Sequence, residues 1–165
     1  MSAKDKYEFH LQNWSDIQDH LPRLFSAAKG NVLEIGVRSG VSTSALLAGI
    51  EEKFGHLYSV DIDHCEVFLG HPRWTFYKAD SIKQAEFLQA ILPDKLDVLF
   101  VDGDHTYFGA LSDLMKFGPR AETIFVHDTD APNFPGVRQA VEDFAKGTNR
   151  TVTYHSGSYG LAEIH

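Results

Sequence analysis

Short apolar runs alternate along this chain with segments whose apolar residues recur at the spacing of an α-helix. The runs cover residues 31–37, 57–62, 74–80, 96–103 and 123–128. Helices are predicted around and between them, over 15–29, 41–53, 83–92, 107–117 and about 137–144. Strands that alternate with helices pair in parallel through right-handed crossovers. The pattern therefore favours an α/β fold built on a parallel sheet.

Two of these runs, 32–36 and 96–101, are almost continuously apolar, as expected when helices cover both faces of a parallel sheet. Residues 151–155 and 159–164 flank a turn that contains glycine, and this pattern is typical of an antiparallel hairpin. We predict a Rossmann-like, doubly wound sheet of seven strands, in which five parallel strands are followed by the C-terminal hairpin.

The length of 165 residues, of which 43% are apolar, fits a single domain that buries a hydrophobic core. Residues 1–29 are predicted to form a helical segment ahead of the sheet. Ser15 and Gln18 form a plausible capping box at the start of the 15–29 helix, and Gly30 follows its end. Pro22 lies inside this span and weakens the expectation for its first turns.

Charge and cysteine content exclude several classes of protein. Lys and Arg number 15 against 23 Asp and Glu, a formal charge of −8, with no basic run that could bind nucleic acid or an anionic membrane. A single cysteine, Cys65, excludes an internal disulfide and fits a reducing compartment. The first residues are polar, unlike a signal peptide, and no apolar stretch could span a membrane. A cytoplasmic protein is expected.

An acidic residue lies at or just after the end of every predicted parallel strand. These residues are Glu34, Asp61, Asp80, Asp102 and Asp128. Doubly wound sheets bind ligands at the carboxyl ends of their strands, where the strand order reverses. The alternative is that these acids cap turns and helices, which Asp also favours.

The first turn, E-I-G-V-R-S-G, indicates which ligand could bind there. A dinucleotide fingerprint starting at Gly36 would need glycine where Arg38 and Val41 stand, which argues against a nicotinamide oxidoreductase. Gly36 and Gly40 still permit a tight turn, and the N–H groups of the following helix could bind a small carboxylate. Asp61 is placed to accept hydrogen bonds from ribose hydroxyls, and Asp80 could accept a hydrogen bond from an adenine amino group.

Five segments together resemble a known family: VLEIGVRSGVSTSALL, LYSVDID, FYKADS, DVLFVDGDHTYFGALSDL and IFVHDTDAPNFPGVRQAVEDF. In this order they are similar to the motifs of class I S-adenosylmethionine-dependent methyltransferases. The resemblance is greatest to the small-molecule O-methyltransferases that include the macrolide sugar enzymes and the cephalosporin-biosynthesis enzyme. It extends over about residues 30–164 and implies a seven-stranded sheet ending in a hairpin.

The resemblance also implies roles for individual residues. The S-adenosylmethionine contacts would be Glu34, Gly36, Arg38, Ser39, Gly40, Ser42, Asp61, Asp80, Ser81 and Asp102. A divalent cation, Mg²⁺ or Mn²⁺, would be held by Asp102, His127 and Asp128. Catalysis would rest on Asp102 and on His105 as general base. The family usually has an acid or amide where His127 stands. The length of 165 residues is not expected to leave room for the accessory N-terminal segment that often covers the substrate in this family, so a second copy of the chain is expected to help complete the acceptor pocket.

The positions of the strands support a shared cation independently of the family. Neighbouring strands lie about 4.8 Å apart, so the carboxylates of Asp102 and Asp128 can share one ion. Other interpretations stay open: His127 as a core histidine, His105 as an exposed residue near a helix start, and Asp102 as a loop or cofactor contact. We predict methyl transfer to a hydroxyl oxygen of a small molecule. The alternatives are methylation of nitrogen, or a cofactor-binding protein without catalysis, which would not need Asp102, His105 and Asp128 together.

Overall fold

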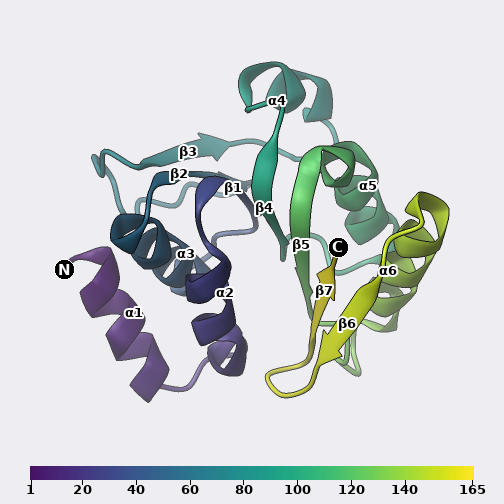
Figure 1. The fold of residues 1–165 in the computed structure, drawn as a ribbon, viewed down its shortest axis with the longest axis horizontal. Coiled ribbons are helices and arrows are strands. Elements are labelled where there is room, and N and C mark those ends of the chain that lie inside the picture. The colour runs from purple at the N-terminus through teal and green to yellow at the C-terminus, as the bar shows by residue number, and fades with distance from the viewer.

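A computed structural model describes all 165 residues and contains one seven-stranded sheet (Figure 1). Its strands are β1 (Gly30–Ile35), β2 (Gly55–Asp61), β3 (Trp74–Lys78), β4 (Leu96–Val101), β5 (Ala121–His127), β6 (Val152–His155) and β7 (Leu161–Ile164). They lie in the order β3-β2-β1-β4-β5-β7-β6. Strands β1 to β5 are parallel, and β7 runs antiparallel to both β5 and β6. The predicted fold class is confirmed.

Three helices pack on each face of the sheet. One face is covered by α1 (Ala3–Gln12), α2 (Leu21–Ala27) and α3 (Val41–Glu52), and the other by α4 (Ala85–Ile91), α5 (Tyr107–Phe117) and α6 (Pro135–Thr148) (Figure 1). Short 3₁₀ helices span Gln18–His20 and Gly118–Arg120. None of the helices is long and apolar enough to cross a membrane.

Alternation along β4 explains why its sequence is apolar apart from Asp97. Val98 and Phe100 belong to the core beneath α1, α2 and α3. Leu99 and Val101 belong to the core beneath α4, α5 and α6. Successive side chains of a strand point to opposite faces, so a strand that helices cover on both sides is apolar along its covered length.

The prediction of one helix over 15–29, with a capping box at Ser15 and Gln18, was wrong. Residues 18–20 form a 3₁₀ turn, and α2 begins only at Leu21, without a side-chain cap. Pro22 explains this start, because proline lacks an N–H group and suits the first turn of a helix. The capping box belongs to α1, which was not predicted as a separate helix. Ser2 Oγ accepts from the Asp5 N–H at 3.1 Å, and Asp5 Oδ2 accepts from the Ser2 N–H at 3.0 Å.

Candidate functional site

The strand order brings the ends of β1, β2 and β4 together. The chain proceeds from β1 outward to β3 and then returns to place β4 on the other side of β1, so the order reverses between β1 and β4. Gly36 follows β1 with φ of +93°, and a Cβ atom there would collide with the Asp102 carbonyl. The register sets Gly36 between the ends of β2 and β4. Only glycine fits a position this crowded at that φ.

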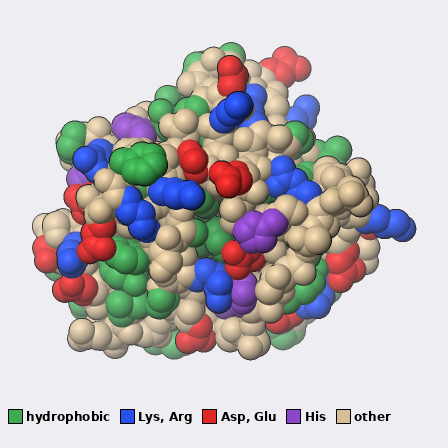
Figure 2. Space-filling model, viewed as in Figure 1, with side chains coloured by type: hydrophobic (Ala, Val, Ile, Leu, Met, Phe, Trp, Pro, Cys, Tyr) green, Lys and Arg blue, Asp and Glu red, His purple; other side chains and the backbone are tan.

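A cavity of about 490 Å³ opens at this edge of the sheet. Six of the predicted cofactor residues line it: Gly36, Arg38, Asp61, Asp80, Ser81 and Asp102. His105 lines it as well, whereas Glu34, Ser39, Gly40 and Ser42 do not. Figure 2 shows acidic and histidine side chains beside one another near the middle of the face seen in Figure 1.

Asp61 holds the loop that follows β1. Its Oδ2 accepts from the backbone N–H groups of Val37 at 2.7 Å and Arg38 at 3.0 Å, and its Oδ1 accepts from the N–H of Asp63 at 2.8 Å. Partial burial would raise the pKa of Asp61, but these donors outweigh it and lower the pKa. The side chain therefore stays an anionic acceptor on the cavity wall.

Asp80 caps the turn after β3, as the alternative interpretation of the strand-end acids anticipated. Its Oδ1 accepts from the N–H groups of Ile82 at 3.0 Å and Lys83 at 2.9 Å. The Lys83 ammonium lies 2.9 Å from Oδ2. The backbone bond from Lys83 is the first cause of a lowered pKa of Asp80. Asp80 nevertheless remains on the cavity wall beside Ser81.

Glu34 lies beneath the cavity rather than on its wall. The residue is fully buried, and its carboxyl accepts from the hydroxyls of Ser42 at 2.6 Å, Thr43 at 2.9 Å and Ser59 at 2.7 Å. Ser59 Oγ in turn accepts from the indole N–H of Trp74 at 2.9 Å. Burial raises the pKa of Glu34 to about 7 despite these donors. In this structure Glu34 ties the start of α3 to the sheet.

We expect Glu34 to make stability depend on pH between its ordinary pKa near 4.5 and about 7. In that window the folded chain keeps a proton that the unfolded chain has released, so the free energy of unfolding falls as pH rises. Urea denaturation of wild type and Glu34→Gln at pH 5 and pH 8 measures this. The advantage of wild type over the variant should shrink by on the order of 3 kcal/mol toward pH 8. An equal difference at both pH values would show that Glu34 titrates normally.

Four side chains at the ends of β4 and β5 meet beside the cavity. His105 Nε2 lies 3.4 Å from Asp102 Oδ1 and 3.1 Å from Asp128 Oδ2. His127 Nδ1 lies 3.2 Å from Asp102 Oδ1 and 3.5 Å from Asp128 Oδ1. Ligand atoms of Asp102, His105 and Asp128 all fall within 4.8 Å of one another. The structure thus brings together every predicted metal ligand and adds His105.

The other nitrogen of His127 is committed to the backbone. Nε2 donates to the Ser158 carbonyl at 2.8 Å, which leaves Nδ1 facing the two carboxylates. Burial would lower the pKa of His127, but Asp102 and Asp128 outweigh it and raise the pKa well above its usual range. Burial would likewise raise the pKa of Asp102, but the two imidazoles lower it. The hydrogen bond to Asp102 is the first cause of a raised pKa of His105.

Besides the bond from His127, two further hydrogen bonds from other segments hold the turn between β6 and β7 that supplies this carbonyl. Gly157, Ser158, Tyr159 and Gly160 all have positive φ. His20 donates to the Gly157 carbonyl at 2.8 Å, and the N–H of Asp130 donates to the Tyr159 carbonyl at 2.7 Å. His20 is thus a structural histidine, and its partner could not be predicted, because a backbone carbonyl leaves no signal in the sequence.

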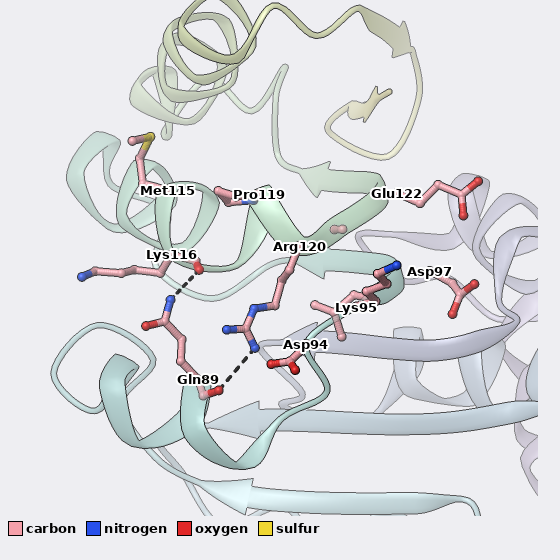
Figure 3. A pocket seen from close by; sticks show the side chains of 11 residues that line it. Gln89, Asp94, Lys95, Asp97, Met115, Lys116, Pro119, Arg120 and Glu122 are labelled. Atoms are coloured by element: carbon pink, nitrogen blue, oxygen red, sulfur yellow. Dashed lines mark hydrogen bonds between the residues drawn. The ribbon is translucent and has the colours of Figure 1, made fainter.

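A larger cavity, of about 770 Å³, lies at the opposite ends of β4 and β5 (Figure 3). Arg120 donates there to the carbonyls of Gln89 at 3.4 Å and Pro93 at 3.1 Å, and Gln89 donates to the Lys116 carbonyl at 2.7 Å. These bonds tie the end of α4 to α5 and to the start of β5. The cavity lies away from the strand-end acids, so its size does not make it the candidate active site.

Comparisons with known proteins identify the family to which the chain is related. A family model described as a methyltransferase domain matches residues 33–129, which is more than half of the chain. No curated protein matches the chain. Among solved structures, an O-methyltransferase from Bacillus cereus in complex with SAH is 16% identical with a TM-score of 0.70, over 97% of this chain and 90% of that one.

Two further structures are similar in fold. SAH-bound PaMTH1, a methyltransferase from Podospora anserina, is 14% identical with a TM-score of 0.65, over 99% of this chain and 86% of that one. MycE, a mycinamycin-pathway methyltransferase solved with Mg, SAH and mycinamycin VI, is 18% identical with a TM-score of 0.70. The match covers all of this chain but only 54% of MycE. The chain belongs to the family of methyltransferase domains and has the fold of the class I S-adenosylmethionine-dependent enzymes.

Proposed function

We propose that the protein transfers a methyl group from S-adenosylmethionine to a hydroxyl oxygen of a small molecule, with the help of a divalent cation. The observation that carries this proposal is the position of Asp102 and His105. Both line the cavity at the ends of β1, β2 and β3, and both belong to the carboxylate and imidazole cluster at the ends of β4 and β5. A protein that only bound the cofactor would have no need of that cluster.

The cavity walls suit a nucleoside. Asp61 is an anionic acceptor at the end of β2 and is placed to accept from ribose hydroxyls. Asp80 and Ser81 offer oxygen atoms further along the same wall. Bound there, S-adenosylmethionine supplies an electrophilic methyl group on sulfur. Glu34 would act indirectly, by fixing Ser42 and Thr43 in the first turn of α3.

The donor set at the ends of β4 and β5 fits a divalent cation. Two carboxylates with an imidazole suit Mn²⁺, and Mg²⁺ is the alternative where waters complete the site. Asp102, Asp128 and His127 would hold the ion, and it would lower the pKa of an acceptor hydroxyl. Metal-binding histidines usually donate their other ring N–H to a carboxylate or carbonyl, as His127 does to Ser158.

His105 would take the proton of the acceptor. Its ring is half-buried, lies with its centroid 4.5 Å from that of Phe134, and opens onto the cavity. S-adenosylmethionine would supply the methyl group to the acceptor oxygen and leave as S-adenosylhomocysteine, and the hydroxyl proton would pass to the His105 imidazole. Positioning contributes much of the rate of such an in-line displacement. Here Asp102 and Asp128 orient the imidazole.

We expect Asp61→Ala to weaken binding of S-adenosylmethionine by about 1–3 kcal/mol, because the ribose hydroxyls lose a charged acceptor. Titration calorimetry on wild type and variant measures the affinity, and a melting curve checks that the variant is folded. NADH serves as the comparison ligand. Unchanged affinity in a folded variant would remove the ribose assignment. Tighter binding of NADH than of S-adenosylmethionine by wild type would overturn the proposed function.

A further inference from the structure

The cavity at the ends of β1, β2 and β4 carries an excess of negative charge. Two basic side chains line it, Arg38 and His105. The Arg38 guanidinium lies 3.1 Å from Asp16, which stands outside the cavity, and His105 lies between Asp102 and Asp128. Against these two stand five carboxylates on the same wall: Asp61, Asp63, Asp80, Asp102 and Asp104.

The charges of Asp63 and Asp104 have no structural use. Of the five acids, only Asp80 forms an ion pair with a lysine or arginine, at 2.9 Å from Lys83. Asp63 is exposed at the cavity wall. Asp104 Oδ1 accepts from the Thr106 N–H at 2.8 Å, a bond that an uncharged asparagine could also accept. Both acids therefore add negative charge to the cavity that neither the fold nor the mechanism described above requires.

The ligand proposed for this cavity changes its charge when it reacts. S-adenosylmethionine has a sulfonium, an ammonium and a carboxylate, and so carries one net positive charge. S-adenosylhomocysteine has a neutral thioether in place of the sulfonium and carries no net charge. Opposite charges attract more strongly in a partly enclosed cavity than in bulk water. Only the methylated form gains this attraction from the acidic wall.

We propose that Asp63 and Asp104 make the cavity selective for the cationic form of the cofactor, so that it holds S-adenosylmethionine and releases S-adenosylhomocysteine readily. At methyl transfer the positive charge leaves the sulfur. The acceptor proton, which His105 takes, carries that charge on to solvent. The attraction of the wall is thus lost at the step that forms the product. This inference rests on the proposed function, because it assumes that S-adenosylmethionine occupies the cavity.

The test measures binding in the absence of an acceptor, by titration calorimetry at one fixed Mg²⁺ concentration. Three ligands are compared: S-adenosylmethionine, S-adenosylhomocysteine and sinefungin, which bears a protonated amine in place of the methylated sulfonium. Both cationic ligands should bind wild type about tenfold more tightly than S-adenosylhomocysteine at low ionic strength. That preference should fall severalfold in about 0.5 M NaCl, because salt screens the carboxylates.

Matched variants assign the preference to individual charges. Asp63→Asn and Asp104→Asn each remove one charge and keep the shape of the side chain. Each should lower the preference for S-adenosylmethionine about twofold to threefold, through weaker binding of the cationic ligands alone. Asp94→Asn removes an exposed carboxylate at the opposite ends of the strands and should leave the preference unchanged. Melting curves check folding, since a merely structural role would weaken all three ligands together.

Each outcome decides between the inference and the proposed function. If S-adenosylhomocysteine binds as tightly as S-adenosylmethionine, or if salt leaves the preference unchanged, charge selection is wrong and the proposed function stands. Sinefungin that binds like S-adenosylhomocysteine has the same meaning, because methyl contacts then account for the preference. If Asp104→Asn does not fold, an unchanged preference in Asp63→Asn overturns the inference. If none of the three ligands binds wild type, the proposed function fails and this inference fails with it.

Discussion

Asp128→Asn is expected to abolish methyl transfer while leaving the affinity for S-adenosylhomocysteine nearly unchanged. The substitution keeps the shape of the side chain, and asparagine tolerates the φ of +62° found at this position. What it removes is an anionic ligand. A cation that polarises the acceptor contributes several kcal/mol to the transition state, so the loss should be roughly 10³-fold or more. The cofactor cavity, which Asp128 does not line, should be unaffected.

Methyl transfer measured with Mg²⁺ or Mn²⁺ titrated into wild type and variant tests this expectation. A chelator should reproduce the loss in wild type. Asp130→Asn is the matched control, because it removes an acid two residues away that pairs with Arg138 at the surface. If wild-type turnover ignores the chelator, the cation has no role, and His105 must activate the acceptor alone.

His105→Ala is expected to lower the rate by about 10²–10⁴-fold, the usual contribution of a positioned general base. Affinity for the cation and for S-adenosylhomocysteine should persist, because Asp102, Asp128 and His127 remain. The rate is measured at saturating acceptor and cation, and cation affinity is measured separately by calorimetry.

The matched control for that experiment is His64→Ala, because His64 pairs with Glu66 on the surface. A second comparison uses His127→Ala. If His105→Ala lowers the affinity for the cation and His127→Ala does not, the assignment of the two histidines is reversed. His105 is then a cation ligand, and His127 is a charged partner of the two carboxylates. Full activity in His105→Ala would remove it from the mechanism.

The sequence predicts well which residues lie at this edge of the sheet, because the positions of the strands depend on local patterns. Each parallel strand is a buried run of fixed period, and the residue that follows it must lie at one edge of the sheet. The pattern of strands alone is therefore enough to assign Asp61, Asp80 and Asp102 to one cavity. Gly36 can likewise be assigned to a tight turn, because it directly follows the first of these strands.

Partners from distant segments could not be predicted in this way. Glu34 was expected on the cavity wall, but Ser42, Thr43 and Ser59 enclose its carboxyl beneath it. The burial of Asp113 on α5 could have been predicted, because this acid stands where the helical spacing calls for an apolar residue. For α1 the signal was Ser2 followed three residues later by Asp5.

The turn of residues 157–160 joins the two ends of the chain. His20 and Gly157 are 137 positions apart, yet their bond helps to fix the carbonyl that orients His127. Contacts between such distant positions carry the largest loop-closure entropy, and a non-glycine residue with positive φ adds strain that only a finished environment sustains. The residues that line the cavity at the ends of β1, β2 and β4 all lie between positions 35 and 105. The orientation of His127, in contrast, depends on a contact between residues near the two ends of the chain, so a growing chain is expected to form that cavity before it can fix His127.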